Sequence, residues 1–385
     1  MSSQPAWGGR LRARPGQGRP LALDNTRQPL AGPLMRGQPA QSAPRMLSNL
    51  FTVCGHAHAL CATLALHAAQ GHAIALDEHS QRLHAMNTAR DHAVRLCLDW
   101  PLLLSADDTL QATASQAGAA ALQRFPWRPG AQRPAPVDAG DASDAMAGWL
   151  AQLLGLAPAD WLSRWSRDGA GWLSEWSDVG TSLWLRDLLR SCEAAARRPI
   201  HASPPLLVHA DPDALRQLAS ALQLKQPATA CAETGTWTRL HARAQAQPVN
   251  AWERLGSRIA ELARLGLPQP ASADGEAGLS SGALALGPNE GLAWIEMARG
   301  LLIHRVALEG SAAQARVADY DVLAPTDWNF HPQGAVAQAL ESMPAAGHEL
   351  RHRVNVLMAA YDPCVAFEID AAAGAEKKDE TDTHA

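Results

Sequence analysis

The chain of 385 residues lacks most of the features that identify a common class of protein. It has no uninterrupted apolar run of about 18 residues, which excludes transmembrane helices and predicts no membrane insertion. Basic residues are not in excess, since the net charge is −5, and nucleic acid is therefore not an expected partner. Phenylalanine and tyrosine are scarce, with 4 and 2 residues beside 13 tryptophans.

The cysteines are scattered and form no close pair. They are Cys54, Cys61, Cys97, Cys192, Cys231 and Cys364. No two are separated by only two residues, so the chain has neither a zinc-type pair nor the cysteine density of a disulfide scaffold. The basic amino-terminal residues are not followed by the apolar stretch of a secretory signal. We therefore expect a cytoplasmic protein whose thiols stay reduced and free to hold metal.

Common catalytic motifs are also missing. No nucleotide-binding glycine loop, zinc-protease helix or serine-hydrolase elbow occurs in the sequence. Histidines cluster between 56 and 92, but His56 and His58 lie on different sides of a helix. Such histidines are more typical of helix packing than of a metal site. The many tryptophans are interpreted as packing or partner-contact residues.

What the chain does have is a globular composition, with 47% hydrophobic and 18% charged residues. Strand-like alternation between glycine-containing turns predicts an antiparallel meander over 291–326. The spacing of apolar residues predicts helices over 46–69, 75–100, 213–224, 251–265, 333–343 and 347–360, with short tryptophan-bearing helices between 149 and 184. The predicted fold class is thus α+β and helix-dominated, with a small antiparallel sheet near the carboxyl end.

The same patterns predict a single domain between two tails. Residues 1–18 are rich in Gly, Arg and Pro and are expected to be disordered, as is the polar tail 371–385. The domain covers 19–370, with a loop near 125–144 and a flexible connection over 271–291. The helix over 75–100 is expected to end at Pro101 and to bury a stripe that includes His79 and Arg90.

Four short fragments carry the strongest chemical signal, because they occur together in one order. They are LFTVCGHA (50–57), EMARG (296–300), APTDWN (324–329) and DPCVAF (362–367). In order and relative position they resemble the large subunit of NiFe-hydrogenases, which has C-G-x-C, E-x-P-R-G, P-T/S-x-W-N and D-P-C-x-x-C. In that family the four cysteines hold one Ni–Fe centre.

The departures from the family pattern remove ligands. Ala57 and Phe367 stand where the family has the second cysteine of each pair, which bridges nickel and iron. Cys54 and Cys364 match the two terminal nickel ligands. Asp370 replaces the histidine that marks the maturation cleavage site. Because two thiolates leave nickel under-coordinated, the resemblance implies no catalytic residue, no hydrogenase activity and no stably bound nickel.

The pocket around the family's iron is better preserved. Arg299, Pro325 and Thr326 match residues that lie beside the iron and hydrogen-bond its cyanide ligands in hydrogenases. Guanidinium and hydroxyl donors suit an anionic diatomic ligand in a dry cavity. This combination is similar to the hydrogenase expression/formation proteins of the HupK/HoxV type, which are ligand-poor paralogues of the large subunit.

The resemblance implies a non-catalytic maturation scaffold or chaperone that transiently holds an iron with cyanide and carbonyl ligands at Cys54 and Cys364. Its partners would be hydrogenase maturation proteins and the large-subunit precursor. Cys61, in the place of a family histidine, is either a third ligand or a core thiol. Arg299 is either a donor to the iron unit or a partner of Glu296. The alternative function is a metal-free large-subunit mimic, acting only as an interaction or protection protein in the maturation complex.

Overall fold

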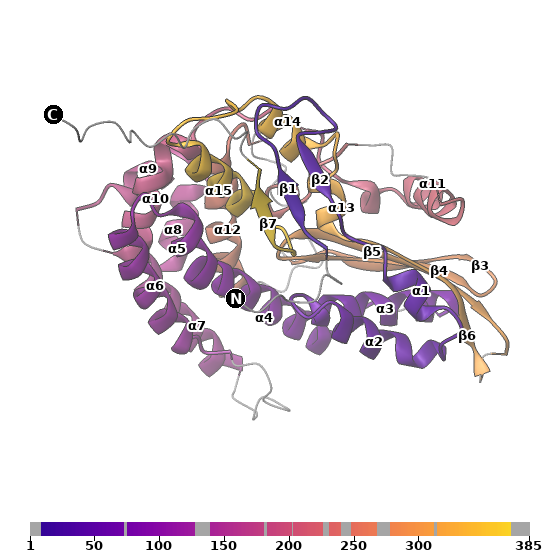
Figure 1. The fold of residues 1–385 in the computed structure, drawn as a ribbon. Coiled ribbons are helices and arrows are strands. Elements are labelled where there is room, and N and C mark those ends of the chain that lie inside the picture. The colour runs from indigo at the N-terminus through magenta and orange to yellow at the C-terminus, as the bar shows by residue number, and fades with distance from the viewer. Residues whose placement is uncertain are drawn as a thin grey trace.

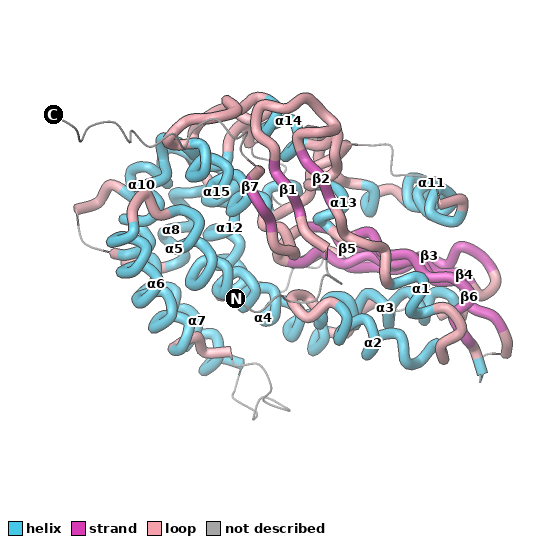
Figure 2. The backbone as a smooth tube through the Cα atoms, in the orientation of Figure 1, coloured by secondary structure: helices cyan, strands magenta, loops and turns pink. Residues whose placement is uncertain are grey.

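The computed structural model describes residues 9–72, 75–127, 139–180, 183–201, 203–225, 231–239, 248–267, 278–311 and 314–370. A bundle of helices lies beside a four-stranded sheet, and helices from the amino-terminal part of the chain cover one face of that sheet (Figure 1). Helices predominate over strands (Figure 2). The predicted α+β, helix-dominated class with a small antiparallel sheet is confirmed.

The helical bundle encloses the largest apolar core. Asp77 and Asn250 cap two of its helices, because their side chains accept hydrogen bonds from the N–H groups of the first turn. Five of the six tryptophans between 149 and 184 are buried in this core, which confirms the predicted packing role for these five. The bundle comprises α4 (Glu78–Val94), α5 (Trp100–Leu104), α6 (Asp108–Gln123), α7 (Ala139–Leu154), α8 (Pro158–Trp165), α9 (Gly169–Ser177), α10 (Trp184–Ala196), α12 (Ala251–Leu265) and α15 (Leu350–Tyr361).

The four-stranded sheet is the predicted antiparallel meander with one extra strand. Its order is β3 (Ser281–Gly287), β4 (Glu290–Met297), β5 (Gly300–Glu309) and β6 (Arg316–Leu323). Met297 pairs with Gly300, so Ala298 and Arg299 form a two-residue hairpin turn. Gly300 has a φ of +131°, a conformation that glycine adopts without strain. Arg299 is therefore held at the tightest turn of the sheet.

The remaining helices pack on this sheet, on one another or, for α14, on α15 and β2. Cys54 and Cys61 belong to a second apolar core, between α3 and the sheet. Leu215 of α11 packs with Leu292 and Ile303 in a third core. The helices are α1 (Ala31–Met35), α2 (Ala43–Leu50), α3 (Gly55–Ala69), α11 (Pro212–Gln223), α13 (Pro325–Asn329) and α14 (Ala335–Glu341).

A second sheet, which the sequence did not predict, ties the two ends of the domain together. Its order is β2 (Leu23–Asn25), β1 (Leu11–Ala13) and β7 (Phe367–Ile369), and β1 runs parallel to β7. The prediction of disorder over 1–18 is therefore wrong for residues 9–18, and the domain begins before residue 19. Leu11 and Ala13 are buried, so this strand is anchored by its apolar face despite its many Gly, Arg and Pro neighbours.

Three other boundaries differ from the predictions. The loop predicted near 125–144 is shorter, because α7 already begins at Ala139, while 128–138 lie outside the described residues. The predicted flexible connection contains β3 at its carboxyl end, paired along β4. The helix does not end at Pro101: a π-helical turn over Arg95–Asp99 leads into α5, where the proline lies in the first turn and its missing N–H costs nothing. The polar tail that was predicted over 371–385 lies outside the described residues.

Helix α3 lies close against the sheet, and this contact depends on Gly291. A Cβ at Gly291 would lie 2.4 Å from the carbonyl oxygen of Ala65 and 2.5 Å from the amide nitrogen of Ala69. Both atoms belong to the backbone of α3, so no side chain can rotate away. Helix α3, and Cys54 immediately before it, can therefore lie this close to the sheet only because residue 291 is a glycine.

We expect Gly291→Ala to lower the free energy of unfolding by about 1–3 kcal/mol, because it overpacks the interface between helix and sheet. Gly287→Ala is the matched control, since a Cβ there meets nothing within 4 Å. It should change stability by less than about 0.5 kcal/mol. Urea unfolding of both variants checks this, and equal effects would contradict the assigned contact.

Candidate metal-binding site

Cys54 lies immediately before α3. Its carbonyl oxygen accepts hydrogen bonds from the N–H groups of Ala57 and His58, which start the helix. The side chain is 5% exposed, and burial raises the pKa of the thiol to about 12. The charge of Arg299 acts to lower this pKa, and Cys364 acts to raise it.

Cys364 lies after α15, in the loop that leads to β7. The helix ends at Asp362, which has a left-handed backbone with φ 53° and ψ 73°, and Pro363 prevents its continuation. The Sγ of Cys364 is 3.0 Å from Oγ1 of Thr326, so a thiolate at Cys364 would accept a hydrogen bond from that hydroxyl. Thr326 is fixed in turn within α13, directly after Pro325. Cys364 is partly exposed, unlike Cys54.

Asp362 is the charged centre of the site, because three arginines from different elements converge on its carboxylate. Arg95 Nε lies 2.9 Å from Oδ1, while Arg258 Nη1 and Arg299 Nε lie 3.2 Å and 3.3 Å from Oδ2. Burial acts to raise the pKa of Asp362, but Arg299, Arg95 and Arg258 together lower it to about 2. The carboxylate is therefore ionised under all ordinary conditions.

One carboxylate does not satisfy three guanidinium groups. Within the described part of the chain, Nη1 of Arg299 and Nη2 of Arg258 are buried and have no hydrogen-bond partner. Asp91 is a second carboxyl that interacts with Arg299, and burial raises its pKa to about 6. The arginine cluster thus keeps buried cationic donors that no described residue accepts. These donors fit an anionic ligand on a metal that is bound through the thiols.

Thr234, which the sequence did not single out, fixes two of the motif segments to each other. Its backbone N–H and C=O bond the side-chain amide of Asn329 at 2.9 and 2.7 Å. Its hydroxyl accepts the N–H of Leu301 at 2.8 Å, next to the Arg299 turn. The EMARG and APTDWN fragments are therefore positioned by one buried threonine.

Cys61, the possible third ligand, lies elsewhere, as do His304 and His331. Cys61 is fully buried, and its Sγ lies 3.5 Å from the carbonyl oxygen of Ala293 in β4, which favours the core interpretation. His304 is bonded to His58 and Tyr320 within the core, and His331 lies 3.8 Å from Cys231. The described residues contain no group of three or more His, Cys, Asp or Glu arranged to hold a metal ion.

Arg299 does not pair with Glu296, which was the alternative to its role as a donor. The carboxylate of Glu296 instead lies 3.7 Å from Arg239 and accepts the N–H of Ser280 at 2.9 Å. Glu296 and Arg299 flank the hairpin turn but have different partners. Arg299 is thus free of its sequence neighbour and acts on Asp362 and on the two thiols.

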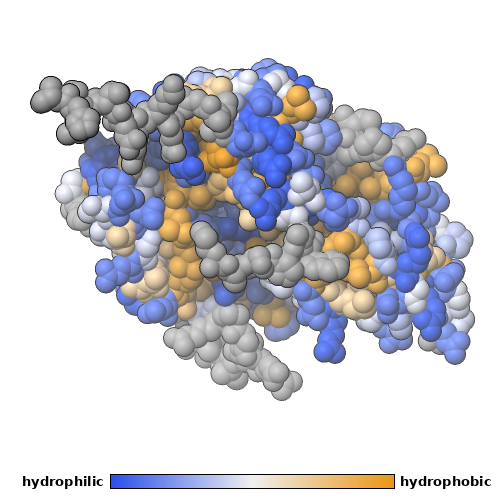
Figure 3. Space-filling model, viewed as in Figure 1, coloured by the Kyte–Doolittle hydropathy of each residue, from blue (hydrophilic) through white to orange (hydrophobic). Residues whose placement is uncertain are grey.

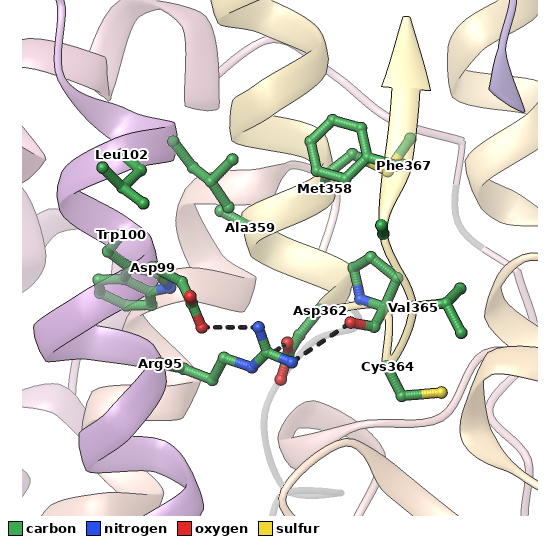
Figure 4. Close-up of a pocket in the computed structure, with 13 residues that line it drawn as sticks. Arg95, Asp99, Trp100, Leu102, Met358, Ala359, Asp362, Cys364, Val365 and Phe367 are labelled. Carbon is green, nitrogen blue, oxygen red and sulfur yellow. Dashed lines mark hydrogen bonds and ion pairs between the residues drawn. The ribbon is translucent and has the colours of Figure 1, made fainter. Parts of the chain in front are cut away.

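A groove opens beside Cys364. It has a volume of about 290 Å³ and lies between α5 and β7, with Met358 of α15 between them (Figure 4). Arg95 lies at its polar end, where it bonds Asp99 at 2.6 Å and the carbonyl oxygen of Pro363 at 3.4 Å. Cys364 is therefore reachable from the surface, whereas Cys54 lies deeper.

Asp362→Asn should lower the free energy of unfolding at neutral pH by about 3–5 kcal/mol, because it leaves buried arginines without their counter-charge. Asp99→Asn is the matched control: it also removes a partner of Arg95, but a half-exposed one, so we expect less than about 1 kcal/mol. The pKa of Asp362 is lowered, so its contribution is present above about pH 4 and lost as the pH falls through about 2. Denaturation of both variants between pH 2 and 7 checks this.

Asp91 should give the opposite pH dependence. Its pKa is raised to about 6, so its neutral form is favoured by folding. Relative to Asp91→Asn, the native chain should be most stable below about pH 4 and should lose about 2–3 kcal/mol as the pH rises through about 6. Urea unfolding of both proteins across this range measures the difference. A constant difference between them would show that Asp91 does not titrate there.

Comparison with known proteins places the chain in a family. No protein-family model matches it. The hydrogenase expression/formation protein HoxV of Cupriavidus necator is 40% identical, over 97% of this chain and 98% of the relative. The hydrogenase expression/formation protein HupK of Azotobacter vinelandii is 31% identical, over 85% of this chain and 87% of the relative.

A solved structure confirms the fold. The Ni-Fe-Se hydrogenase of D. vulgaris Hildenborough, in the as-isolated oxidized state, is similar with a TM-score of 0.54. The match covers 89% of this chain and 92% of that chain at 12% identity. The predicted hydrogenase large-subunit-like fold is therefore confirmed. Its sequence identity to the C. necator and A. vinelandii proteins, over most of its length, shows that the chain belongs to the HoxV/HupK family of hydrogenase expression/formation proteins.

Proposed function

We propose that this protein takes part in hydrogenase maturation as a non-catalytic scaffold that transiently holds an iron with cyanide and carbonyl ligands. The relatives named above support the general role, since both are hydrogenase expression/formation proteins. The iron unit is cargo that the protein receives and gives up. It is bound through Cys54 and Cys364, and its diatomic ligands supply the coordination that two thiolates leave open.

The observation that carries this proposal is the buried guanidinium of Arg299, which pairs with Asp362 through Nε and leaves its Nη1 without an acceptor in the described part of the chain. Arg299 is 2% exposed, and its Nη1 has no hydrogen-bond partner among the described residues. A buried donor without a partner is unfavourable by about 1–3 kcal/mol, more when it is charged. A cyanide ligand on thiol-bound iron would accept this hydrogen bond, and Thr326 and Pro325 would complete the pocket on the side of Cys364.

The residues that replace the family's bridging cysteines support a non-catalytic role. Ala57 is fully buried in α3 and Phe367 belongs to β7, and neither side chain offers a ligand atom. The site therefore has no thiolates with which to bridge nickel to iron, and nickel is not expected to be stably bound. We expect the partners to be hydrogenase maturation proteins and the large-subunit precursor, which would meet this chain in the cytoplasm. Among the described residues, no helix is long and apolar enough to cross a membrane.

Infrared spectroscopy tests the proposal. The protein is purified without oxygen from cells that express the maturation proteins, and the stretching bands of metal-bound carbonyl and cyanide are recorded. Cys54→Ala and Cys364→Ala should each abolish the bands and the bound iron. Cys61→Ala should keep both, because that thiol is directed at the sheet, and Cys192→Ala controls for loss of a buried thiol remote from the site.

Two outcomes would contradict the scaffold. Wild-type protein without bands and without iron would support the metal-free mimic of the large subunit. Bands that survive in both Cys54→Ala and Cys364→Ala would place the iron unit elsewhere in the chain.

Arg299→Lys tests the outer donor separately. Lysine keeps the charge but loses the planar set of donors, so the cyanide bands should shift and iron retention should fall about 10- to 100-fold. The carbonyl band should become weaker in proportion to the iron lost, but the iron that is retained should still show it. Unchanged cyanide bands would show that Arg299 serves only the ion pair with Asp362.

A further inference from the structure

Two histidines of neighbouring helices meet in a polar contact that the proposed iron site does not use. On the surface, hydrophobic residues gather in the strip between the bundle helices and the three-stranded sheet (Figure 3). The contact between the first turn of α3 and the second turn of α4 is different, because His56 and His84 meet there with their ring centres 5.6 Å apart and their planes tilted by 44°. His84 is only 2% exposed, so its imidazole is shielded from solvent.

The hydrogen bond of His84 determines which of its nitrogens carries a lone pair. Its Nε2 lies 2.6 Å from the backbone carbonyl oxygen of Glu296, and a carbonyl can only accept, so Nε2 carries the proton. Burial lowers the pKa of His84 to about 4, and the ring is therefore neutral at neutral pH. The lone pair is then on Nδ1, which is buried and has no partner among the described residues. A ring whose N–H is held by a backbone carbonyl is the usual arrangement of a metal-binding histidine.

His56 presents a second nitrogen of this kind. Its Nε2 is buried and likewise lacks a hydrogen-bond partner in the described part of the chain. With metal–nitrogen bonds of about 2.1 Å, two imidazoles on one tetrahedral ion have ring centres roughly 5–6 Å apart. The separation of 5.6 Å between His56 and His84 agrees with this value. His58 and His304 form a contrasting pair, because their ring nitrogens bond each other directly at 3.0 Å and leave no room for an ion.

The face of α4 that carries His84 also carries oxygen atoms that suit a hydrated cation. Thr88 and Asp91 follow His84 by four and seven residues, which places all three on one face of the helix. Oγ1 of Thr88 and Oδ2 of Asp91 are buried, and no described residue bonds them. Arginine charges act on His56 and oppose a cation there, so the carboxylate of Asp91 is the counter-charge that such an ion needs.

We propose that Nε2 of His56 and Nδ1 of His84 bind a divalent metal ion of the zinc, copper, nickel or ferrous iron class. Imidazole favours these ions, whereas Mg²⁺ and Ca²⁺ require oxygen ligands. No third His, Cys, Asp or Glu of the described residues is arranged with the pair to hold the ion. Water therefore fills the open positions, and the ion exchanges readily. This site uses other atoms than the proposed iron site and does not depend on it.

Isothermal titration calorimetry with Zn²⁺ tests this on the full-length chain. The chain carries Cys54→Ser and Cys364→Ser, which removes the thiols of the proposed iron site and keeps the two proposals separate. One zinc ion is expected to bind with a Kd of about 100 µM or below. His56→Ala and His84→Ala should each weaken this binding about tenfold or more. His79→Ala, at an exposed histidine of α4, is the matched control and should leave it unchanged.

Nuclear magnetic resonance identifies the nitrogens that bind the ion. Long-range proton–nitrogen spectra are recorded on the same chain, labelled in its histidine rings, with and without Zn²⁺. Zinc should shift Nε2 of His56 and Nδ1 of His84, while Nε2 of His84 keeps its proton because it is bonded to Glu296. The two alanine variants assign the resonances, and circular dichroism melts confirm that each variant is folded.

Three results would overturn the proposal. The first is a chain that binds no zinc below about 1 mM. The second is zinc binding that survives in both His56→Ala and His84→Ala, since the ion would then lie on other groups. The third is zinc that leaves the ring nitrogens of His56 and His84 unshifted, which would make the pair a packing contact. Absence of iron bands in the infrared experiment would contradict the scaffold function and leave these results unaffected.

Discussion

The ion pairs of Asp362 with Arg95, Arg258 and Arg299 are the constraint on which the site depends. They join the turn after α4, the middle of α12, the β4–β5 hairpin and the end of α15, which are far apart in the sequence. A buried carboxylate is tolerated only when such partners compensate its lost hydration. Because Cys364 follows two residues later, the same contacts fix the direction from which its thiol meets Thr326.

Because one carboxylate serves three guanidinium groups, some buried N–H donors of the arginines have no acceptor among the described residues. Such a site suits a protein that binds its ligand transiently. The Cys54 thiol has a raised pKa and is protonated at neutral pH, while Arg299 keeps an unpaired donor. In the proposed function the cargo corrects both, because metal binding replaces the thiol proton and a cyanide accepts the hydrogen bond. When the cargo leaves, the thiol is protonated again and the Arg299 donor again lacks an acceptor. The free energy of cargo binding is therefore limited. If every polar group of the empty site had a hydrogen-bond partner, the site would gain less from binding the cargo. If the site had four thiolates, it would bind the cargo too tightly to release it readily.

Sequence reasoning located the motif residues but not the residues that connect them. Cys54, Cys364, Arg299 and Thr326 were predicted because short fragments carry them in a fixed order, and the helix over 251–265 was predicted because its periodicity is local. Arg258 and Asp91 were not predicted. The signal that could have indicated them is a charged residue on the face of α12 or α4 that is buried. The predicted stripe of α4 included His79 and Arg90, whereas the structure buries His84 and His92 against polar partners. Asp91 is buried on the same helix. The parallel pairing of β1 with β7 joins residues more than 350 apart, and no local pattern encodes it.

Ala57 and Phe367, the two residues at which the family pattern predicts a bridging cysteine, have different surroundings. Ala57 is fully buried in the tightly packed contact of α3, where a small side chain fills the space and nothing new is formed. Phe367, at the corresponding place near the other end of the chain, begins β7 and forms a wall of the groove beside Cys364. The position to which the family pattern assigns a bridging cysteine is therefore, in this chain, an apolar side chain on the wall of a groove that Cys364 also lines.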